Sequence, residues 1–138
     1  MRKIKYTFLL LITSIISSCV SEKDPMTSAE KYMANKYNAE WTDIIIRQTE
    51  TKKNGKVTER REYIGVQILN STDIDRILGE KDYARKRMTN VANFVLDSVD
   101  LGEMTFVPKE IEIEYLKEEG FIFQNVANQT MVFELDKT

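Results

Sequence analysis

Three glutamates near the C-terminus alternate with apolar residues and are the first candidates for chemistry. Glu110, Glu112 and Glu114 fall on one face of a predicted strand, with Ile111 and Ile113 on the other. A row of carboxylates could bind Ca²⁺ or a basic partner. Calcium needs about six to eight oxygen ligands, usually from a loop, and a strand spreads its carboxylates too far apart to wrap one ion. We therefore interpret the row as a solvated sheet face and predict no metal site.

Residues for catalysis are scarce. The chain has no histidine, which removes the commonest general base, the usual zinc ligand and the partner of a serine or cysteine nucleophile. Its glycines are isolated, so no loop can cradle phosphate, and no serine stands in a Gly-x-Ser-x-Gly setting. Asp73-Ile74-Asp75 lacks the remainder of a calcium loop. We predict no catalytic residue and no cofactor; paired carboxylates, as in glycosidases, are the remaining route to catalysis.

Two further groups could bind a ligand. The cations are Arg85, Lys86 and Arg87, and the aromatic residues are Tyr32, Tyr37 and Trp41. Three consecutive cations could contact a polyanion, but their position in a helical pattern favours the wet side of an amphipathic helix. The aromatic residues could stack on sugar rings, although packing between the first helix and the hairpin is the favoured interpretation.

The first half of the chain predicts a helix followed by a hairpin. Thr27 and Glu30 fit a capping box, so a helix is expected over 28–38. Strands are expected over 41–51 and 57–69, joined by Asn54-Gly55, the strongest short hairpin signal. With a two-residue turn, paired positions sum to 109. This register sets Ile45 opposite Ile64, Trp41 opposite Ile68 and Arg47 opposite Glu62.

The second half predicts a long helix and then strands. A short helical turn is expected over 74–78 and a helix over 81–99, with one apolar stripe formed by Ala84, Met88, Val91, Ala92, Val95 and Val99. Alternation predicts strands over 109–117, 121–126 and 130–135, separated by turns at 118–120 and Asn128. The last strand would face Met131, Phe133 and Leu135 inward.

These elements define the expected fold. We predict a two-layer α+β domain over 27–138, in which an antiparallel sheet of four to five strands packs against two main helices. The order is α-β-β-α-β-β with a possible extra strand. Val91 and Val95 should pack against Ile111, Ile113 and Phe133.

The N-terminus carries an export signal. Arg2, Lys3 and Lys5 precede a short apolar stretch that ends in Ile16-Ser17-Ser18-Cys19. This segment is too short to span a bilayer, which needs about 20 apolar residues, and reads as a secretory signal over 1–18. Its end resembles the lipobox of bacterial lipoproteins. The resemblance, which covers only residues 1–19, implies cleavage before Cys19 and attachment of lipid chains such as palmitate to it. The alternative is an ordinary secretory signal that releases a chain with one free thiol.

Residues 19–26 are expected to form a lipidated tether. Val20 follows the cysteine, and the absence of Asp there is compatible with the outer membrane rather than the inner membrane. Ser21-Glu22-Lys23-Asp24 loosely resembles acidic export signals of Bacteroidota surface lipoproteins, and Asp97-Ser98-Val99 resembles the short O-glycosylation motif of exported proteins of that group. A solvated linker explains the first pattern equally well.

The net charge of the chain limits the classes of partner that it could bind. The chain has 20 basic and 22 acidic residues, and loss of Arg2, Lys3 and Lys5 with the signal leaves 17 against 22, a net charge of −5. Such an acidic chain is a poor candidate for nucleic acid. We therefore expect a lipid-anchored, non-enzymatic binding module of the cell envelope, with the membrane and an envelope protein as partners. The alternatives are an inhibitor or immunity-type lipoprotein against an envelope toxin or hydrolase, and a carboxylate-dependent envelope hydrolase.

Overall fold

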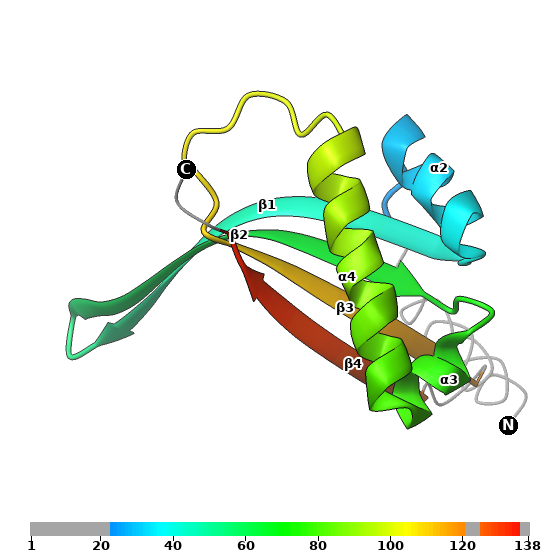
Figure 1. The fold of residues 1–138 in the computed structure, drawn as a ribbon. Helices are drawn as coiled ribbons and strands as arrows, with labels where there is room; N and C mark the ends of the chain where they lie inside the picture. The colour runs from blue at the N-terminus through cyan, green and yellow to red at the C-terminus, as the bar shows by residue number, and fades with distance from the viewer. Residues whose placement is uncertain (1–22, 121–124, 136–138) are drawn as a thin grey trace, which may run out of the picture.

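A computed structural model describes residues 23–120 and 125–135, which form a four-stranded sheet with helices on one face (Figure 1). In chain order the elements are α2 (Ser28–Tyr37), β1 (Trp41–Lys53), β2 (Lys56–Leu69), α3 (Ile74–Gly79), α4 (Lys81–Ser98), β3 (Glu110–Glu119) and β4 (Asn125–Glu134). The predicted signal and Cys19 lie outside the described residues. The α+β class is confirmed.

The helices begin where the sequence predicts. The Thr27 hydroxyl accepts a hydrogen bond from the Glu30 amide at 3.3 Å, and the Glu30 carboxylate accepts one from the Thr27 amide at 2.6 Å, which completes the capping box of α2. α4 buries the predicted stripe from Ala84 to Val95, with Val91 and Val95 fully buried, but it ends at Ser98, so that Val99 is a half-buried C-cap and not part of the helix. A third, short helix, α3, precedes it, so the expectation of two main helices undercounts those in the described part.

The sheet is mixed, not antiparallel as predicted. Its order is β1-β2-β3-β4, and β2 pairs with β3 in parallel, while both hairpin pairs are antiparallel. The cause is the connection between β2 and β3. The 18 residues of α4 carry the chain back for about 27 Å along the sheet. β3 therefore starts at the same end as β2 and runs beside it.

The hairpin register also differs from the prediction. Asn54 and Gly55 form the expected turn, with φ of 53° and 75°, and Lys53 pairs with Lys56 as predicted. A bulge then shifts the register by one residue between Thr51 and Lys52, so that Ile46 faces Ile64 and Ile45 faces Gly65. The shift places Ile44 and Ile46, rather than Ile45, on the helix-covered face.

Only one strand follows β3 in the described residues. β4 runs without interruption from Asn125 to Glu134, and Asn128 pairs with Leu116 inside it. The predicted turn at Asn128 is therefore wrong, and residues 125–126 and 130–134 belong to the same strand, β4, which pairs with β3 and ends one residue before the predicted end. Most of the proposed strand over 121–126 lies outside the described residues.

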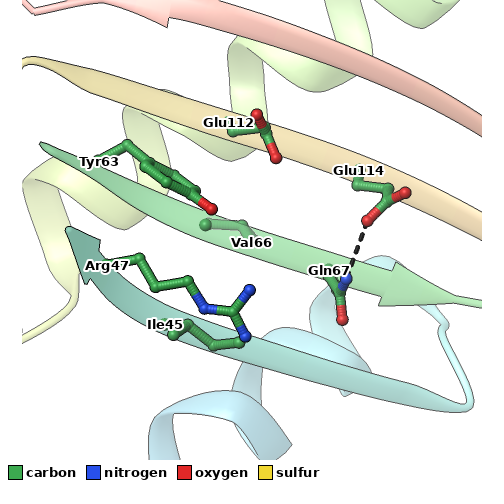
Figure 2. Close-up of a pocket in the computed structure, with 8 residues that line it drawn as sticks. Ile45, Arg47, Tyr63, Val66, Gln67, Glu112 and Glu114 are labelled. Atoms are coloured by element: carbon green, nitrogen blue, oxygen red, sulfur yellow. Dashed lines mark hydrogen bonds between the residues drawn. The ribbon is translucent and has the colours of Figure 1, made fainter. Parts of the chain in front are cut away.

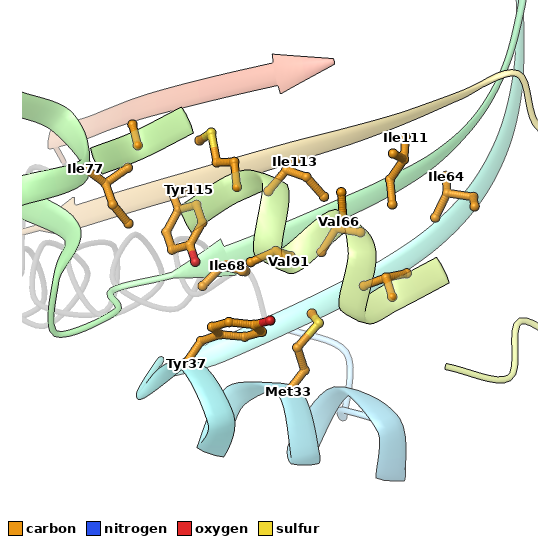
Figure 3. Packing of buried hydrophobic residues seen from close by; sticks show 14 of the residues in the cluster. Met33, Tyr37, Ile64, Val66, Ile68, Ile77, Val91, Ile111, Ile113 and Tyr115 are labelled. Atoms are coloured by element: carbon orange, nitrogen blue, oxygen red, sulfur yellow. The ribbon is translucent and has the colours of Figure 1, made fainter. Parts of the chain in front are cut away.

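The core lies between α4, α2 and the inward face of the sheet (Figure 3). The sheet contributes alternate side chains from its two central strands, which are Ile64, Val66, Ile68, Ile111, Ile113 and Tyr115. Met131 and Phe133 pack against this cluster from β4. The predicted burial of Val91 and Val95 with the β3 isoleucines is confirmed.

The first hairpin extends beyond the rest of the sheet as an arm (Figure 1). β3 begins to pair with β2 only at Tyr63, whereas β1 and β2 continue pairing to Lys53 and Lys56. Residues 47–60 of this hairpin are all exposed. At the opposite end of β1 the chain is held close, since the Trp41 indole donates to the Asp24 carbonyl at 3.3 Å and Lys23 lies 3.2 Å from Glu118.

Candidate functional site

The carboxylates of the glutamate row on the open face of the sheet are bound by neighbouring side chains. Arg61 lies 2.8 Å from the Glu110 carboxylate and 3.0 Å from that of Glu112. Glu114 accepts hydrogen bonds from the side-chain amides of Gln67 at 2.8 Å and Asn128 at 2.9 Å. Within the described residues no group of three or more His, Cys, Asp or Glu side chains could hold a metal ion. The three glutamates are half-buried by these contacts.

A small hollow lies on the same face, over Gly65 (Figure 2). Ile45, Arg47 and Tyr63 border it on one side and Glu112 and Glu114 on the other. Its volume is about 30 Å³, the room of a single water molecule. This hollow is too small for an organic ligand.

A polar cluster lies on the helix side of the sheet, between α3 and α4. The Arg87 Nε lies 3.0 Å from the Asp73 Oδ2, and the Tyr83 hydroxyl donates to the same oxygen at 2.8 Å. Both side chains of the ion pair are mostly buried, with 25% of Arg87 and 17% of Asp73 exposed. The hydrogen bond to Asp73 raises the pKa of Tyr83. The cluster fixes Arg87 in one position.

Two buried tyrosines complete this cluster. The Arg87 guanidinium carbon lies 4.9 Å from the centre of the Tyr37 ring. Tyr115 is fully buried, and its hydroxyl makes no hydrogen bond within the described residues. Burial raises the pKa of both tyrosines, and the nearby charge of Arg87 offsets only part of that effect. Both phenols therefore stay neutral at physiological pH.

Two open hollows flank Arg87 along α4 and share Arg87 and Asn90 in their walls. One has a volume of about 280 Å³ and the other of about 420 Å³, together within the range of small-molecule sites. We name them jointly the α4 groove. Its lining residues are Lys36, Tyr37, Arg76, Tyr83, Lys86, Arg87, Asn90, Asn93 and Phe94. None of them is a carboxylate.

The groove comes mostly from one helix. Tyr83, Arg87, Asn90 and Phe94 follow one another at steps of four, three and four residues along α4, which places them in one stripe beside the apolar stripe of the core. Lys36 and Tyr37 come from the last turn of α2, and Arg76 from α3. The structure thus separates the predicted Arg85-Lys86-Arg87 run: Arg85 and Lys86 are exposed, as predicted, but Arg87 turns towards Asp73.

The aromatic group predicted from sequence is also divided. Tyr37 is buried in the core, Trp41 is half-buried at the start of β1, and Tyr32 is exposed. The Tyr32 ring stacks on Phe94, with ring centres 5.8 Å apart. Phe94 and Asp73 are two residues of this region that sequence reasoning did not select as functional.

One pair of carboxyl groups has opposite pKa shifts. Burial raises the pKa of Glu30, but hydrogen bonds from the amides of Thr27 and Ile44 outweigh it, so the pKa lies below its ordinary value. Burial and the adjacent charge of Glu30 raise the pKa of Asp43. Both Glu30 oxygens accept backbone hydrogen bonds, so this carboxylate holds the edge of β1 against α2.

Comparison with known proteins gives no guide to function: no family model, curated protein or solved structure matches the chain. Of the helices in the described residues, none is sufficiently long and apolar to cross a membrane. Inferences about function therefore depend on the α4 groove and on the sequence of the N-terminus.

Proposed function

We propose that this protein is a lipid-anchored, non-enzymatic binding module of the cell envelope, in the outer membrane rather than the inner membrane, and that its ligand binds in the α4 groove. The observation that carries the proposal is the composition of the groove. Two open hollows are lined by cationic, amide and aromatic side chains, and Arg87, which both hollows share, is paired with Asp73. Such groups orient a ligand by directional hydrogen bonds.

The same composition argues for binding over catalysis. General acid–base catalysis needs a group whose pKa lies near the working pH. The groove lining contains no carboxylate or cysteine, the chain has no histidine, and the pKa of each of Tyr37 and Tyr83 is raised from an ordinary value of about 10. No nucleophile stands beside a base there.

The carboxylate-dependent hydrolase remains an alternative, and Glu30 with Asp43 is its best candidate pair. Opposite pKa shifts in neighbouring carboxyls are typical of an acid and a base in one site. Against it, both oxygens of Glu30 are occupied by backbone amides and only 7% of the residue is exposed. The test is an assay of the purified full chain on glycan, peptide and ester panels. Turnover that disappears in Asp43→Asn would replace the binding proposal with the hydrolase.

The inhibitor or immunity-type lipoprotein is the second alternative. It requires a protein partner on the described surface, and the acidic charge of the mature chain would suit a basic toxin or hydrolase. A pull-down of the membrane-anchored chain, repeated with a groove variant such as Lys86→Gln, distinguishes the inhibitor alternative from ligand binding in the α4 groove. A single stoichiometric basic protein retained by both forms would favour inhibition.

The anchor is tested separately. Lipid on Cys19 is supported by Ile16-Ser17-Ser18-Cys19 after a charged and then an apolar stretch. Replacing Cys19 by Ser should abolish lipid labelling and membrane sedimentation, because the variant lacks the thiol that carries the lipid chains. Stable membrane attachment needs two or more such chains. Undiminished sedimentation of the Cys19→Ser chain would refute the lipid anchor and leave the groove proposal standing.

A further inference from the structure

Three cations of the α4 groove are each held over an aromatic ring. The distances from the charged group to the ring centre are 5.0 Å for Lys36 over Phe94, 3.9 Å for Arg76 over Tyr83 and 4.9 Å for Arg87 over Tyr37. A ring face attracts a cation without neutralising it and leaves its N–H groups able to donate. The rings therefore favour one placement of these three cations along the groove.

The ring contact alone does not distinguish the groove, because Arg61 on the open face of the sheet also lies 4.6 Å from the centre of the Tyr63 ring. The difference is in the pairing of the cations with carboxylates. Arg61 binds two carboxylates, and Lys109 lies 3.0 Å from Glu62. Those charges are compensated within the chain. An anionic ligand would have to displace a carboxylate there, whereas in the groove Lys36, which lies over Phe94, and Lys86 form no ion pair with a described residue.

The groove carries net positive charge in an acidic chain. Its four cations are Lys36, Arg76, Lys86 and Arg87. Two carboxylates pair with them, Glu80 with Arg76 and Asp73 with Arg87, each at 3.0 Å. No ion pair among the described residues involves Lys36 or Lys86. The groove thus keeps an excess of two positive charges, while the mature chain has 17 basic and 22 acidic residues.

The remaining groups suit hydroxyls and a ring. Asn90 and Asn93 can both donate and accept hydrogen bonds, as sugar hydroxyls require. Tyr32, stacked on Phe94 at the groove edge, is 59% exposed and leaves an aromatic face open. Aromatic faces, amides and uncompensated cations together match a sugar ring that carries a carboxylate.

We propose that the α4 groove binds an acidic oligosaccharide, a chain of uronic-acid-type sugars with carboxylates on successive rings. This rests on the proposed function and names its ligand class. Successive carboxylates would meet the two hollows on either side of Arg87, one facing Lys36 and the other Lys86. Hydrogen bonds between charged groups are about twice as strong as neutral ones, so the carboxylates supply most of the selectivity.

The test uses calorimetric titration of the full chain, purified with its anchor in non-ionic detergent, against tetragalacturonate. The comparison probes are neutral maltotetraose, hexaglutamate and glycerol phosphate, which is a soluble analogue of an anionic lipid headgroup. The groove variant is Lys36→Gln with Lys86→Gln. The matched control is Lys31→Gln with Lys81→Gln, which removes the same two charges from exposed positions of the same two helices, outside the groove. Arg87 is left intact because the polar cluster depends on it.

Tetragalacturonate should bind, with affinity reduced at least tenfold in the groove variant and less than twofold in the control. Equal losses in both variants, or no binding by the parent chain, would overturn the proposal. Stronger binding of hexaglutamate or of glycerol phosphate would overturn the sugar class. Equal binding of maltotetraose would overturn the acidic requirement and leave a binding module in place, which distinguishes this failure from that of the proposed function.

Discussion

The guanidinium of Arg87 has the Asp73 carboxylate 3.0 Å away on one side and the Tyr37 ring on the other. Removing one partner of a mostly buried ion pair leaves the other charge uncompensated, and that loss exceeds the net worth of the pair. Arg87 therefore both fixes the helix contact and shapes the groove. Its structural role can be measured separately from ligand binding.

Arg87→Met should lower the free energy of unfolding by about 1–3 kcal/mol. The Asp73 carboxylate would keep its charge but lose its cationic partner, and only the hydrogen bond from Tyr83 would remain. Adding Asp73→Asn should restore part of the loss, since the amide needs no counter-charge and can still accept from Tyr83. Urea unfolding of the full chain in detergent measures the cycle, with Arg85→Met as an exposed control that should cost less than about 0.5 kcal/mol. Additive losses in the double variant would show that the pair is not coupled.

Glu30 should make stability depend on pH. Its pKa lies below the ordinary value of 4.5 because the Thr27 and Ile44 amides bond the charged form. A depressed folded pKa gives stability that is present above the unfolded pKa and lost as the pH falls through the folded one. Glu30→Gln should therefore cost about 1–3 kcal/mol at pH 7.

The cost of Glu30→Gln should shrink steadily below pH 4.5, where the parent side chain also becomes neutral. Urea unfolding at a series of pH values measures the difference between the two proteins. Glu59→Gln, at an exposed position on the hairpin arm, supplies the control and should leave the free energy of unfolding unchanged at every pH. A cost for Glu30→Gln that is constant with pH would mean that the backbone bonds do not depend on the charge.

At the scale of elements, two glycines with open space around them differ in whether the backbone requires glycine. The hairpin turn requires it at Gly55, whereas the end of α3 does not require it at Gly79. An added Cβ at either Gly55 or Gly79 meets nothing within 4 Å. Gly55 has φ of +75°, which L-residues adopt only at a cost of about 1–2 kcal/mol, whereas Gly79 ends α3 without a positive φ. Gly55→Ala should destabilise the hairpin and Gly79→Ala should not.

The arm beyond the sheet packs against little, so the loss at Gly55 should be local. Hydrogen exchange of the amides in 47–61 should accelerate about fivefold or more, since about 1 kcal/mol corresponds to that factor, while exchange in α4 stays unchanged. Equal exchange rates for Gly55→Ala and Gly79→Ala would count against the turn.

The sequence predicts elements better than their pairing. The capping box of α2, the Asn54-Gly55 turn and the buried stripe of α4 depend on near neighbours and are confirmed. The run Ile44-Ile45-Ile46 fits either face of a strand, so alternation could not detect the bulge that puts Ile46 opposite Ile64. Parallel pairing of β2 with β3 depends on how far α4 carries the chain back, which no local pattern records.

The same limit applies to the groove. The stripe of Tyr83, Arg87, Asn90 and Phe94 is visible in the sequence as helical spacing. Its meaning depends on Asp73 and Tyr37, which reach Arg87 only through the folded chain. From the sequence alone, three consecutive cations on a helix predict a solvent-exposed face. Only the folded chain shows that one of the three, Arg87, has a mostly buried partner.

At the scale of the whole molecule, the proposed anchor and the hairpin arm lie at opposite ends of β1. Lys23 contacts Glu118 and Asp24 contacts Trp41, so the chain leaves towards Cys19 from the start of β1. Cys19 precedes Lys23 by four residues, a reach of at most about 14 Å. β1 has 13 residues, which places the turn about 40 Å further along.

This geometry predicts that the arm points away from the membrane on the proposed anchor. A fluorophore on Lys53→Cys should be protected from a quencher in the lipid headgroups, while one on Glu119→Cys, at the anchor end, should be quenched. With Cys19 acylated, each introduced cysteine is the only free thiol, because the chain has no other cysteine.

Three lysines surround the turn, at 52, 53 and 56, and could instead draw the arm to anionic lipid. Vesicles with and without phosphatidylglycerol separate these arrangements: quenching at position 53 that equals quenching at 119, or that rises with anionic lipid, would show that the arm lies on the membrane and not out towards a partner.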